Sequence, residues 1–371
     1  MSRRAAAAAL VLALSCLLSP AAPAALAAAR GEALAPGVHL STASAEADEG
    51  TQYFTTLRVD LGAGPEVDYV DPGSVAARAP LREMADVPGA VAAVNGDFFD
   101  SGASYAPLGA AARGGTALKS PSADNRATAV FDASGRGRIA TASFTGTAGL
   151  PGDDLPLDRL NSHEVPADGT GVFTIHWGDH PRERAAPSGP VTEVVVAEGR
   201  VRDVRTGTGS EPVASGTRVL LGRGAAADRL AALRPGDPVS LDYRLTADGA
   251  HPHLAVGGRH VLLRDGAYTG ATDNARHPRT AIGFSADGTR MFVMTADGRE
   301  PGTAGATLGD MAERMLQAGA HDALELDGGG SATLLARAPG TADLVRRNRT
   351  GEDERAIPNG LVVRTGPGST P

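Results

Sequence analysis

The sequence predicts an α+β fold with mixed, mostly antiparallel β-sheets and a few covering helices. The chain contains 48 glycines and 25 prolines but only 4% aromatic residues, which is typical of short strands joined by many tight turns. The clearest strand pair is Arg279–Phe284 with Thr289–Thr295, because Asp287-Gly288 between these arms is a strong hairpin signal. The clearest helix follows, with Thr307 and Asp310 as a capping box at its start.

The first 29 residues are expected to be a secretory signal peptide. Residues 1–4 are basic, an Ala/Leu/Val run follows, and residues 25–29 contain two overlapping A-x-A cleavage sites. The alternative is an N-terminal membrane anchor, which Pro20 and Pro23 in the apolar run disfavour. The mature protein is therefore predicted to be secreted, and to be extracellular or associated with the cell wall.

Cys16 is the only cysteine of the chain. A lipoprotein cysteine is the alternative reading, but residues 13–15 make a poor lipobox and apolar sequence continues after Cys16. A mature chain without it has no disulfide, no thiol nucleophile and no cysteine metal site. The net charge of −8 argues against nucleic acid as the main partner. No later apolar run approaches the roughly 20 residues that span a membrane.

One domain is expected over residues 51–366, after a flexible lead-in at 30–50 and before a tail at 367–371. Residues 147–190 are rich in Pro, Gly and Asp, which predicts long loops or an insertion. Runs of β-forming residues between turn signals predict further elements: strands at 54–61, 67–70, 91–95, 127–131, 191–196, 200–204, 239–245 and 361–364, and helical segments at 81–85 and 225–233.

The segment Leu324–Ser331 carries the strongest functional signal. It predicts a short buried strand that ends in a carboxylate and runs into three consecutive glycines. Such glycines allow a tight turn, or bring bare backbone N–H groups to a ligand. Alternate strand residues face the same side, so Glu325 and Asp327 would lie about 6.5–7 Å apart on one face. This pair suits acid and base chemistry on a glycosidic bond; the alternative is a solvated glutamate beside a turn aspartate.

Two further clusters contain groups that suit catalysis or anion binding. In Asn95-Gly96-Asp97 the amide can donate and accept hydrogen bonds and the carboxylate can act as a base or ligand; the alternative is an ordinary Asn-Gly turn. The mouth of the predicted hairpin brings Arg279 beside Asp297 and Arg299. Arginine forks suit phosphate oxygens, and the alternative is a structural Arg–Asp pair.

Metal binding has little support in the sequence. His176 and His180 are four residues apart, but the Gly and Pro around them disfavour a helix, and no H-E-x-x-H motif exists. The acidic loop Asp153-Asp154 is a candidate for structural calcium, although it lacks an EF-hand pattern.

Taken in order, these clusters resemble the phosphodiester glycosidase family over roughly residues 50–365. A variable middle region of about residues 140–255 resembles the family least, and it is expected to shape substrate choice. This chain departs from the family pattern at Asp97, where the family often has a second Gly, and at Glu325, where it often has Asn. The matching segments are Asn95-Gly96-Asp97-Phe98-Phe99, Val256-Gly257-Gly258 leading to Leu263-Arg264-Asp265-Gly266, Arg279-Thr280-Ala281-Ile282-Gly283, Asp297-Gly298-Arg299, Leu326-Asp327-Gly328-Gly329-Gly330-Ser331, and Glu354-Arg355 through Asn359.

The resemblance implies a bacterial hydrolase that cleaves a sugar-1-phosphodiester in an envelope or extracellular glycan, with no required cofactor. The alternatives are a non-catalytic module that binds cell-wall glycans, and an ordinary glycosidase that needs no phosphate. The implied catalytic residues are Asp327, Asp97 and Asp297, and the implied substrate-binding residues are Asn95, Gly96, Arg279, Arg299, Gly328, Gly329, Gly330, Ser331, Glu354, Arg355 and Asn359.

Overall fold

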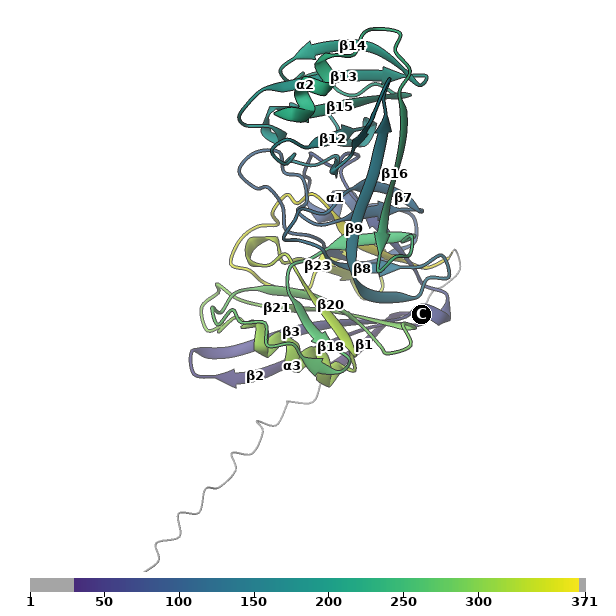
Figure 1. Ribbon diagram of the computed structural model, residues 1–371. Helices are drawn as coiled ribbons and strands as arrows, with labels where there is room; N and C mark the ends of the chain where they lie inside the picture. Colours follow the sequence, from purple (N-terminus) through teal and green to yellow (C-terminus); the bar gives the residue numbers. More distant parts are fainter. Residues whose placement is uncertain (1–29, 367–371) are drawn as a thin grey trace, which may run out of the picture.

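The computed structural model describes residues 30–366, which form four β-sheets and three α-helices (Figure 1). In this part of the chain the paired strands are antiparallel except for β11 (Arg159–Leu160) and β12 (Thr170–Phe173). The predicted antiparallel architecture is confirmed, and helices are scarcer than an α+β fold suggests. No helix within residues 30–366 has the length and apolar character needed to cross a membrane. The predicted signal peptide, Cys16 and the tail lie outside the described residues.

An eight-stranded sheet forms one end of the molecule and carries the helix α3 (Leu308–Ala318) on one face (Figure 1). The helix has the predicted capping box between Thr307 and Asp310 and ends at Gly319, whose φ of 102° is left-handed. The strand order is β1 (Arg30–Ala35), β2 (Val38–Ala47), β3 (Gly50–Asp60), β21 (Arg290–Ala296), β20 (Arg279–Phe284), β22 (Asp322–Leu326), β18 (Val261–Arg264) and β19 (Ala267–Tyr268).

Residues 30–50 form strands, so the prediction of a flexible lead-in there is wrong. β1 pairs with β2, and β2 pairs with β3 from Val38 opposite Val59 to Ala47 opposite Gly50. Val38 and Leu40 are buried, but the rest of β2 is mostly half-exposed Ala, Ser and Thr. A strand with so few large apolar residues shows little alternation in the sequence, and its pairing partners determine its conformation.

A five-stranded sheet packs against the other face of the eight-stranded sheet. Val94 and Leu361 from this sheet share a core with Ile282 and Leu324. The short helix α1 (Leu81–Met84) lies beside it. The strand order is β24 (Leu344–Arg346), β23 (Leu334–Arg337), β5 (Ala90–Asn95), β25 (Gly360–Arg364) and β4 (Glu66–Val70). The ends of β5 and β22 meet where these two sheets join.

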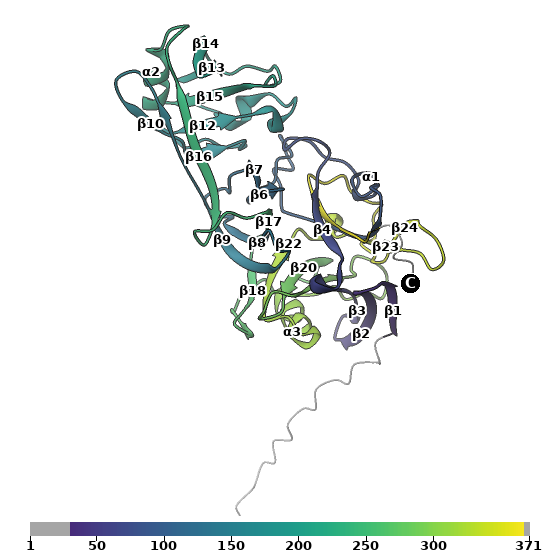
Figure 2. The same cartoon turned by 90° about the vertical axis from the view of Figure 1, so that its right-hand side faces the viewer.

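A third sheet contains two long strands that lead away from this core (Figures 1 and 2). Ala247 lies opposite Ala142 and Ser240 opposite Gly149 along this strand pair. The strands of the sheet are β10 (Asp154–Pro156), β9 (Gly137–Gly149), β8 (Ala127–Phe131), β17 (Leu254–Gly257), β6 (Ala111–Arg113) and β7 (Thr116–Lys119), with β16 (Ser240–Ala247) alongside β9.

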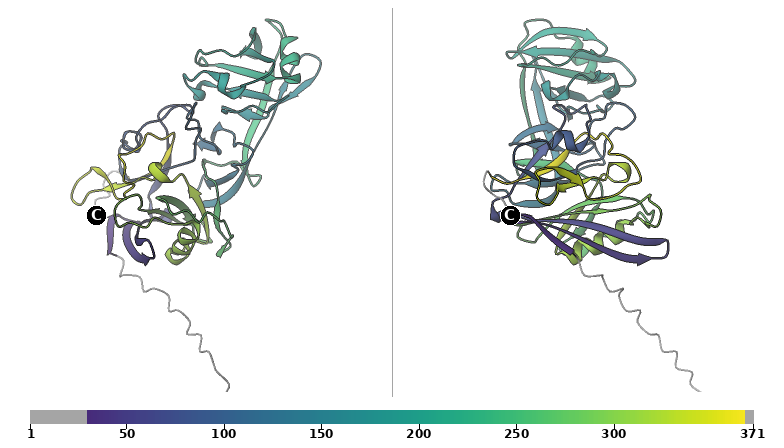
Figure 3. Two further views of the ribbon diagram at one scale, coloured as in Figure 1. Left: turned by 90° about the vertical axis from the view of Figure 1, so that its left-hand side faces the viewer. Right: turned by 180° about the vertical axis from the view of Figure 1, so that it is seen from behind.

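The far end of the molecule is a separate five-stranded sheet, here called the distal sheet, with the helix α2 (Ala225–Ala231) against it (Figure 3). Its order is β11, β12, β15 (Thr217–Arg223), β13 (Val191–Ala197) and β14 (Arg200–Thr206). The strands predicted at 191–196 and 200–204 are confirmed as β13 and β14, which pair antiparallel. Residues 147–190, predicted as long loops or an insertion, also contain β10, β11, β12 and two 3-10 turns, so they are not loops throughout.

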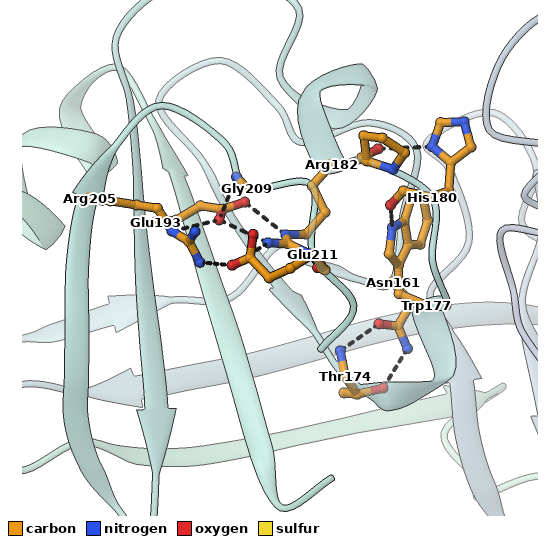
Figure 4. A network of polar contacts seen from close by, with 10 residues as sticks. Asn161, Thr174, Trp177, His180, Arg182, Glu193, Arg205, Gly209 and Glu211 are labelled. Carbon is orange, nitrogen blue, oxygen red and sulfur yellow. Dashed lines mark hydrogen bonds and ion pairs between the residues drawn. The ribbon is translucent and has the colours of Figure 1, made fainter. Parts of the chain in front are cut away.

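A buried ion pair ties the segment before β13 to the distal sheet (Figure 4). The Arg182 and Glu193 side chains are fully buried, with Nε–Oε1 at 2.8 Å and Nη2–Oε2 at 3.1 Å. Glu193 also accepts from the Gly209 N–H at 2.9 Å, and Arg182 donates to the Glu211 carbonyl at 2.7 Å. These extra hydrogen bonds offset the cost of desolvating both charges. Removing one partner would leave the other charge buried without its main counter-charge.

We expect Glu193→Ala to lower the free energy of unfolding by about 3–5 kcal/mol, because Arg182 would lose its buried counter-charge and keep only the half-exposed Glu211 carboxylate at 3.8 Å. The measurement is urea denaturation followed by circular dichroism. The control is Glu198→Ala, which removes an exposed partner of Arg202 and should cost at most about 1 kcal/mol. Equal small losses in both variants would contradict the prediction.

Candidate active site

The candidate site begins where β5 and β22 end side by side. The Asp327 N–H donates to the Gly96 carbonyl at 2.9 Å, and Asn95 Nδ2 donates to the Asp327 carbonyl at 2.7 Å. Asn95 Oδ1 accepts from the Thr280 hydroxyl at 2.9 Å and from the Thr333 N–H at 3.0 Å. The Asn95 side chain is buried and bound to protein partners at both ends, so it holds strand ends together; its predicted sugar contact stays a prediction.

Asp97 lies in a cage built by close backbone approach. Its side chain is 2% exposed, Oδ2 accepts from the Gly109 N–H at 2.5 Å, and Oδ1 makes no hydrogen bond within the described residues. A Cβ at Gly109 would lie 2.8 Å from Oδ2, and one at Gly257 would lie 2.5 Å from it. Glycine is therefore required at both positions, which explains the glycine of the Val256-Gly257-Gly258 segment beside the acid.

Asn359 and Gly96 position the Asp97 backbone. Asn359 Oδ1 accepts from the Asp97 N–H at 2.9 Å, and its Nδ2 donates to the Tyr69 hydroxyl at 3.0 Å. Asn359 is fully buried, and a Cβ at Gly96 would clash with its Oδ1. Both predicted substrate-binding residues therefore serve the architecture around Asp97.

Asp327 faces the loop Gly328–Ser331, here called the glycine loop. Its Oδ1 accepts from the Gly328 N–H at 2.9 Å, and the side chain is less buried than Asp97. Gly329 has a φ of +59° and begins a 3-10 turn. The loop thus combines a carboxylate with backbone that turns in the left-handed region, as the three glycines predict.

Three guanidinium groups, here called the arginine group, lie near Asp327 and the glycine loop: Arg299 and Arg355 lie against the loop, and the charge of Arg259 acts on Asp327. A Cβ at Gly329 would lie 3.0 Å from Arg299 Nη2, and a Cβ at Gly330 would clash with Arg355 Nη2. The glycines thus allow two guanidinium groups to approach the backbone. Arg299 itself has a φ of +61°, an uncommon conformation for a residue with a Cβ, of the kind that collects at functional sites.

Sequence reasoning missed Arg259 and Glu352. The Arg259 guanidinium stacks 4.1 Å from the centre of the Phe98 ring, and it has no side-chain hydrogen bond or ion pair within residues 30–366. Glu352 bridges the other two arginines, with Oε1 2.9 Å from Arg299 and Oε2 3.3 Å from Arg355. The position of Arg259 directly after Gly257-Gly258 was the only available signal, since backbone-approach glycines often border a site.

Burial sets the ionisation of Asp97 and Asp327, here called the acid pair. Burial raises the pKa of Asp97 to about 7, and the negative charge of Asp327 also raises it. The hydrogen bond from the Gly109 N–H and the positive charge of Lys119 act in the opposite direction and lower it. Burial also raises the pKa of Asp327 to about 6, while the Ser331 hydroxyl and the positive charges of Arg355 and Arg259 lower it. Both carboxyls can therefore change their protonation state near neutral pH.

Arg279 forms a buried structural pair and does not point a free fork at a ligand. Its guanidinium donates to Glu325 Oε1 at 2.8 Å, to Asp273 Oδ2 at 2.7 Å, and to the carbonyls of Ala275 and Ala306. Glu325 Oε2 lies 2.6 Å from His260 Nδ1. The structural alternative for Arg279 therefore fits its contacts, and the predicted phosphate contact would require these bonds to be exchanged.

Asp297 and Glu354 hold loops at the border of the site. Asp297 is buried and accepts from the Arg349 N–H at 3.0 Å, and burial raises its pKa to about 6. Glu354 accepts from the Arg82 N–H at 2.9 Å and from Arg82 Nε at 2.7 Å. The structure gives neither side chain a bond to the acid pair, because both are used to anchor backbone.

The residues that could hold a metal lie away from the acid pair. In the described part of the chain, Asp265, His321 and Asp322 have ligand atoms within 4.8 Å of one another, at the opposite end of β22 from Asp327. At the predicted calcium loop, Arg229 Nη2 lies 3.1 Å from Asp153 Oδ2 and donates to the Asp154 carbonyl at 2.8 Å. The cation that neutralises this loop is thus an arginine.

We expect the stability of Asp97→Asn relative to the wild type to increase as the pH rises from about 4 to 7. Folded Asp97 binds its proton more tightly than an unfolded aspartate, so its burial costs stability progressively between about pH 4 and pH 7. Thermal unfolding of both proteins at steps of pH measures this difference. The control is Asp287→Asn at an exposed turn, where hydrogen bonds from Ser285 and Thr289 hold the pKa to about 2; its stability relative to wild type should stay constant over that range. If the difference in stability between Asp97→Asn and the wild type did not change with pH, the raised pKa of buried Asp97 would be contradicted.

Comparison with known proteins gives a family match for part of the chain. Residues 191–364 match the phosphodiester glycosidase family. A segment of 63 residues is 46% identical to the SPbeta prophage-derived uncharacterized protein YomE of Bacillus subtilis (strain 168). This match covers 17% of the present chain and 10% of YomE, so the chain spans only a small part of that relative's length.

Two solved structures share the fold. A hypothetical protein from Synechocystis has a TM-score of 0.74 at 23% identity, over 89% of this chain and 62% of that chain. A putative exported protein from Burkholderia pseudomallei K96243 has a TM-score of 0.73 at 19% identity, over 94% of this chain and 98% of that chain. Asp327, the glycine loop and the arginine group all lie within residues 191–364, and over these residues the resemblance to the phosphodiester glycosidase family is confirmed.

Proposed function

We propose that this protein is a hydrolase that cleaves the bond between the anomeric carbon of a sugar and a phosphodiester. The observation that carries the proposal is the joint position of the acid pair and the arginine group around the glycine loop. A glycosidase needs a carboxyl with a suitable pKa beside the anomeric carbon. A phosphodiester substrate adds a negative charge, which guanidinium groups bind well.

The arginine group is proposed to bind the phosphate. Glu352 supports this assignment, because its carboxylate already lies between Arg299 and Arg355 and interacts with both. An anion thus fits between these two side chains, and phosphate oxygens would replace the carboxylate there. Arg259, stacked on Phe98 and unpaired within residues 30–366, supplies a third positive charge. Backbone N–H groups of the glycine loop would bind the remaining oxygens.

The acid pair is proposed to act on the attacking water and on the developing charge at the anomeric carbon. The group that leaves is a phosphate monoester, which departs readily, so protonation of the leaving group matters less than in an ordinary glycoside. Asp327 is the more exposed member and removes the proton from water as its oxygen attacks the sugar. Asp97 is proposed to stabilise, in its ionised form, the positive charge that develops at the anomeric carbon. Because burial raises its pKa to about 7, this contribution should increase as the pH rises through neutrality.

We also propose that the protein is secreted and that its substrate is a glycan-phosphate of the cell envelope or the extracellular space. The basic start, apolar run and small-residue sites of residues 1–29 support secretion. The fold shared with a putative exported protein is consistent with it. The distal sheet, which belongs to the variable middle region, is proposed to determine which glycan is accepted.

Asp327→Asn is expected to lower kcat on a sugar-1-phosphodiester by about 10²–10⁴-fold, because the variant has no base for the attacking water. Release of free sugar from a panel of sugar-1-phosphodiesters measures it, with circular dichroism to show folding. Full activity of the folded variant would remove Asp327 from the mechanism. If the wild-type protein binds envelope polymers but releases no sugar from any panel member, the protein is a binding module and the enzyme proposal fails.

Arg259→Gln is expected to raise KM for sugar-1-phosphodiesters by roughly tenfold, the effect of losing about 1.4 kcal/mol of charge-assisted binding. The matched control is Arg314→Gln, which removes a guanidinium that stacks 5.5 Å from Phe54 on another part of the protein. Kinetics at two salt concentrations should show a weaker salt dependence in Arg259→Gln alone. If the wild-type protein hydrolyses phosphate-free glycosides as well as sugar-1-phosphodiesters, and Arg259→Gln does not change this activity, the protein is an ordinary glycosidase instead.

A further inference from the structure

Lys119 is the only lysine of the chain, and every other basic residue among the 35 lysines and arginines is arginine. Its side chain is completely buried. An exposed lysine can usually be replaced by arginine, but a compact ammonium group in the interior has no such substitute. The single lysine therefore occupies a position where the size and the three-donor geometry of an ammonium group matter.

The ammonium group lies at the end of β7 and uses all three of its donors on backbone carbonyls. Lys119 Nζ donates to the carbonyls of Ser120 at 2.7 Å, Gly109 at 3.2 Å and Leu108 at 3.3 Å. Within residues 30–366 no carboxylate lies close enough to form an ion pair with it. A buried charge in such a place is costly unless an opposite charge lies nearby.

The nearby opposite charge is Asp97, and one peptide group connects the two. The carbonyl of the Leu108–Gly109 peptide accepts from Lys119 Nζ, and the N–H of the same peptide donates to Asp97 Oδ2. Hydrogen bonds in series polarise one another, so the cation strengthens the peptide as a donor to the carboxylate. The same turn carries Gly109, whose missing side chain allows the approach to Asp97.

We propose that Lys119 is a positioning residue for Asp97: its ammonium group orders the Leu108–Gly109 turn that binds the carboxylate and supplies the buried positive charge that this carboxylate faces. Its consequence for catalysis rests on the proposed role of the acid pair. The coupling between Lys119 and Asp97 does not, because it concerns two buried charges and can be measured without substrate.

The other charged groups around the two residues are less suited to this role. Glu164 and Arg159 act on Lys119, but they form a longer pair of 3.8 Å in which Glu164 is about half exposed and screened by solvent. His163 also lies near, and burial together with Lys119 lowers its pKa to about 4, so it is neutral at pH 7. On the other side, Asp327 and Tyr69 face Asp97.

Ionisation of the two groups is expected to be linked. Burial lowers the pKa of Lys119 to about 8, and among the nearby charges Asp97 opposes this most. Removing the Asp97 charge should therefore lower the pKa of Lys119 further. By the same coupling, removing the Lys119 charge should raise the pKa of Asp97 and move the rise of activity with pH to higher pH.

The experiment uses the single lysine as its own probe. The protein is produced with ¹³C-labelled lysine, which gives one side-chain signal, and that signal is titrated by NMR in the wild type and in Asp97→Asn. We expect the titration midpoint to fall by about one pH unit or more in Asp97→Asn. Asp297→Asn, which alters another buried acid, is the control and should leave it unchanged. Equal midpoints in the wild type and Asp97→Asn would overturn the proposal.

A second variant tests the catalytic consequence. Lys119→Met keeps the length of the side chain but removes its charge, and we expect the acidic limb of the kcat profile to move up by about one pH unit. A merely structural role would lower activity at every pH without moving this limb, and that result would overturn the catalytic part. The variant leaves three carbonyls without a donor and can fail to fold; the lysine titration then decides, since it needs only the native lysine. Absence of all activity in the wild type would contradict the proposed function but not the charge coupling.

Discussion

The Asn95 side chain holds the candidate site together. It joins the end of β5 to the Asp327 backbone, to Thr280 on β20 and to Thr333 after the glycine loop. Each of these segments comes from a different part of the chain, and each brings one component of the site. The two packed sheets provide a rigid frame, but this one buried amide determines how their ends align. A site built on strand ends in this way is positioned more accurately than one built on free loops.

The chemistry of the site follows from how deeply each charged group is buried. Asp97 lies in a glycine cage with one oxygen bound and one oxygen without a protein partner, whereas Asp327 is more exposed and lies against the glycine loop. Desolvation brings the pKa values of both acids close to neutral pH. The arginines also differ in burial. Arg279 is buried and its hydrogen-bond acceptors come from the protein, while Arg259, Arg299 and Arg355 are accessible to solvent. Only the accessible group can exchange its partners for a ligand.

The distal sheet stands apart from the chemistry. The long strands β9 and β16 connect it to the core (Figures 1 and 2), and its own stability depends on the buried pair of Arg182 and Glu193 (Figure 4). All of its strands lie within the middle region of about residues 140–255. The proposed role of the distal sheet in substrate selection is compatible with its separation from the ends of β5 and β22.

The sequence by itself determined the local features. The Asp287-Gly288 hairpin, the capping box at Thr307, the terminating Gly319 and the glycine loop after Asp327 all depend on neighbouring residues, whose backbone preferences are visible in the chain. It also indicated the family, through short motifs in a fixed order. Only the tertiary structure decided what each polar residue does. Asn95, Asn359 and Arg279 were predicted to touch substrate but are bound to protein partners, because segments 46 to 290 residues apart in the sequence meet there. Arg259, Glu352 and Lys119 gained their places for the same reason: burial and long-range contact, which no local pattern records, determine whether a charge is structural or free to act.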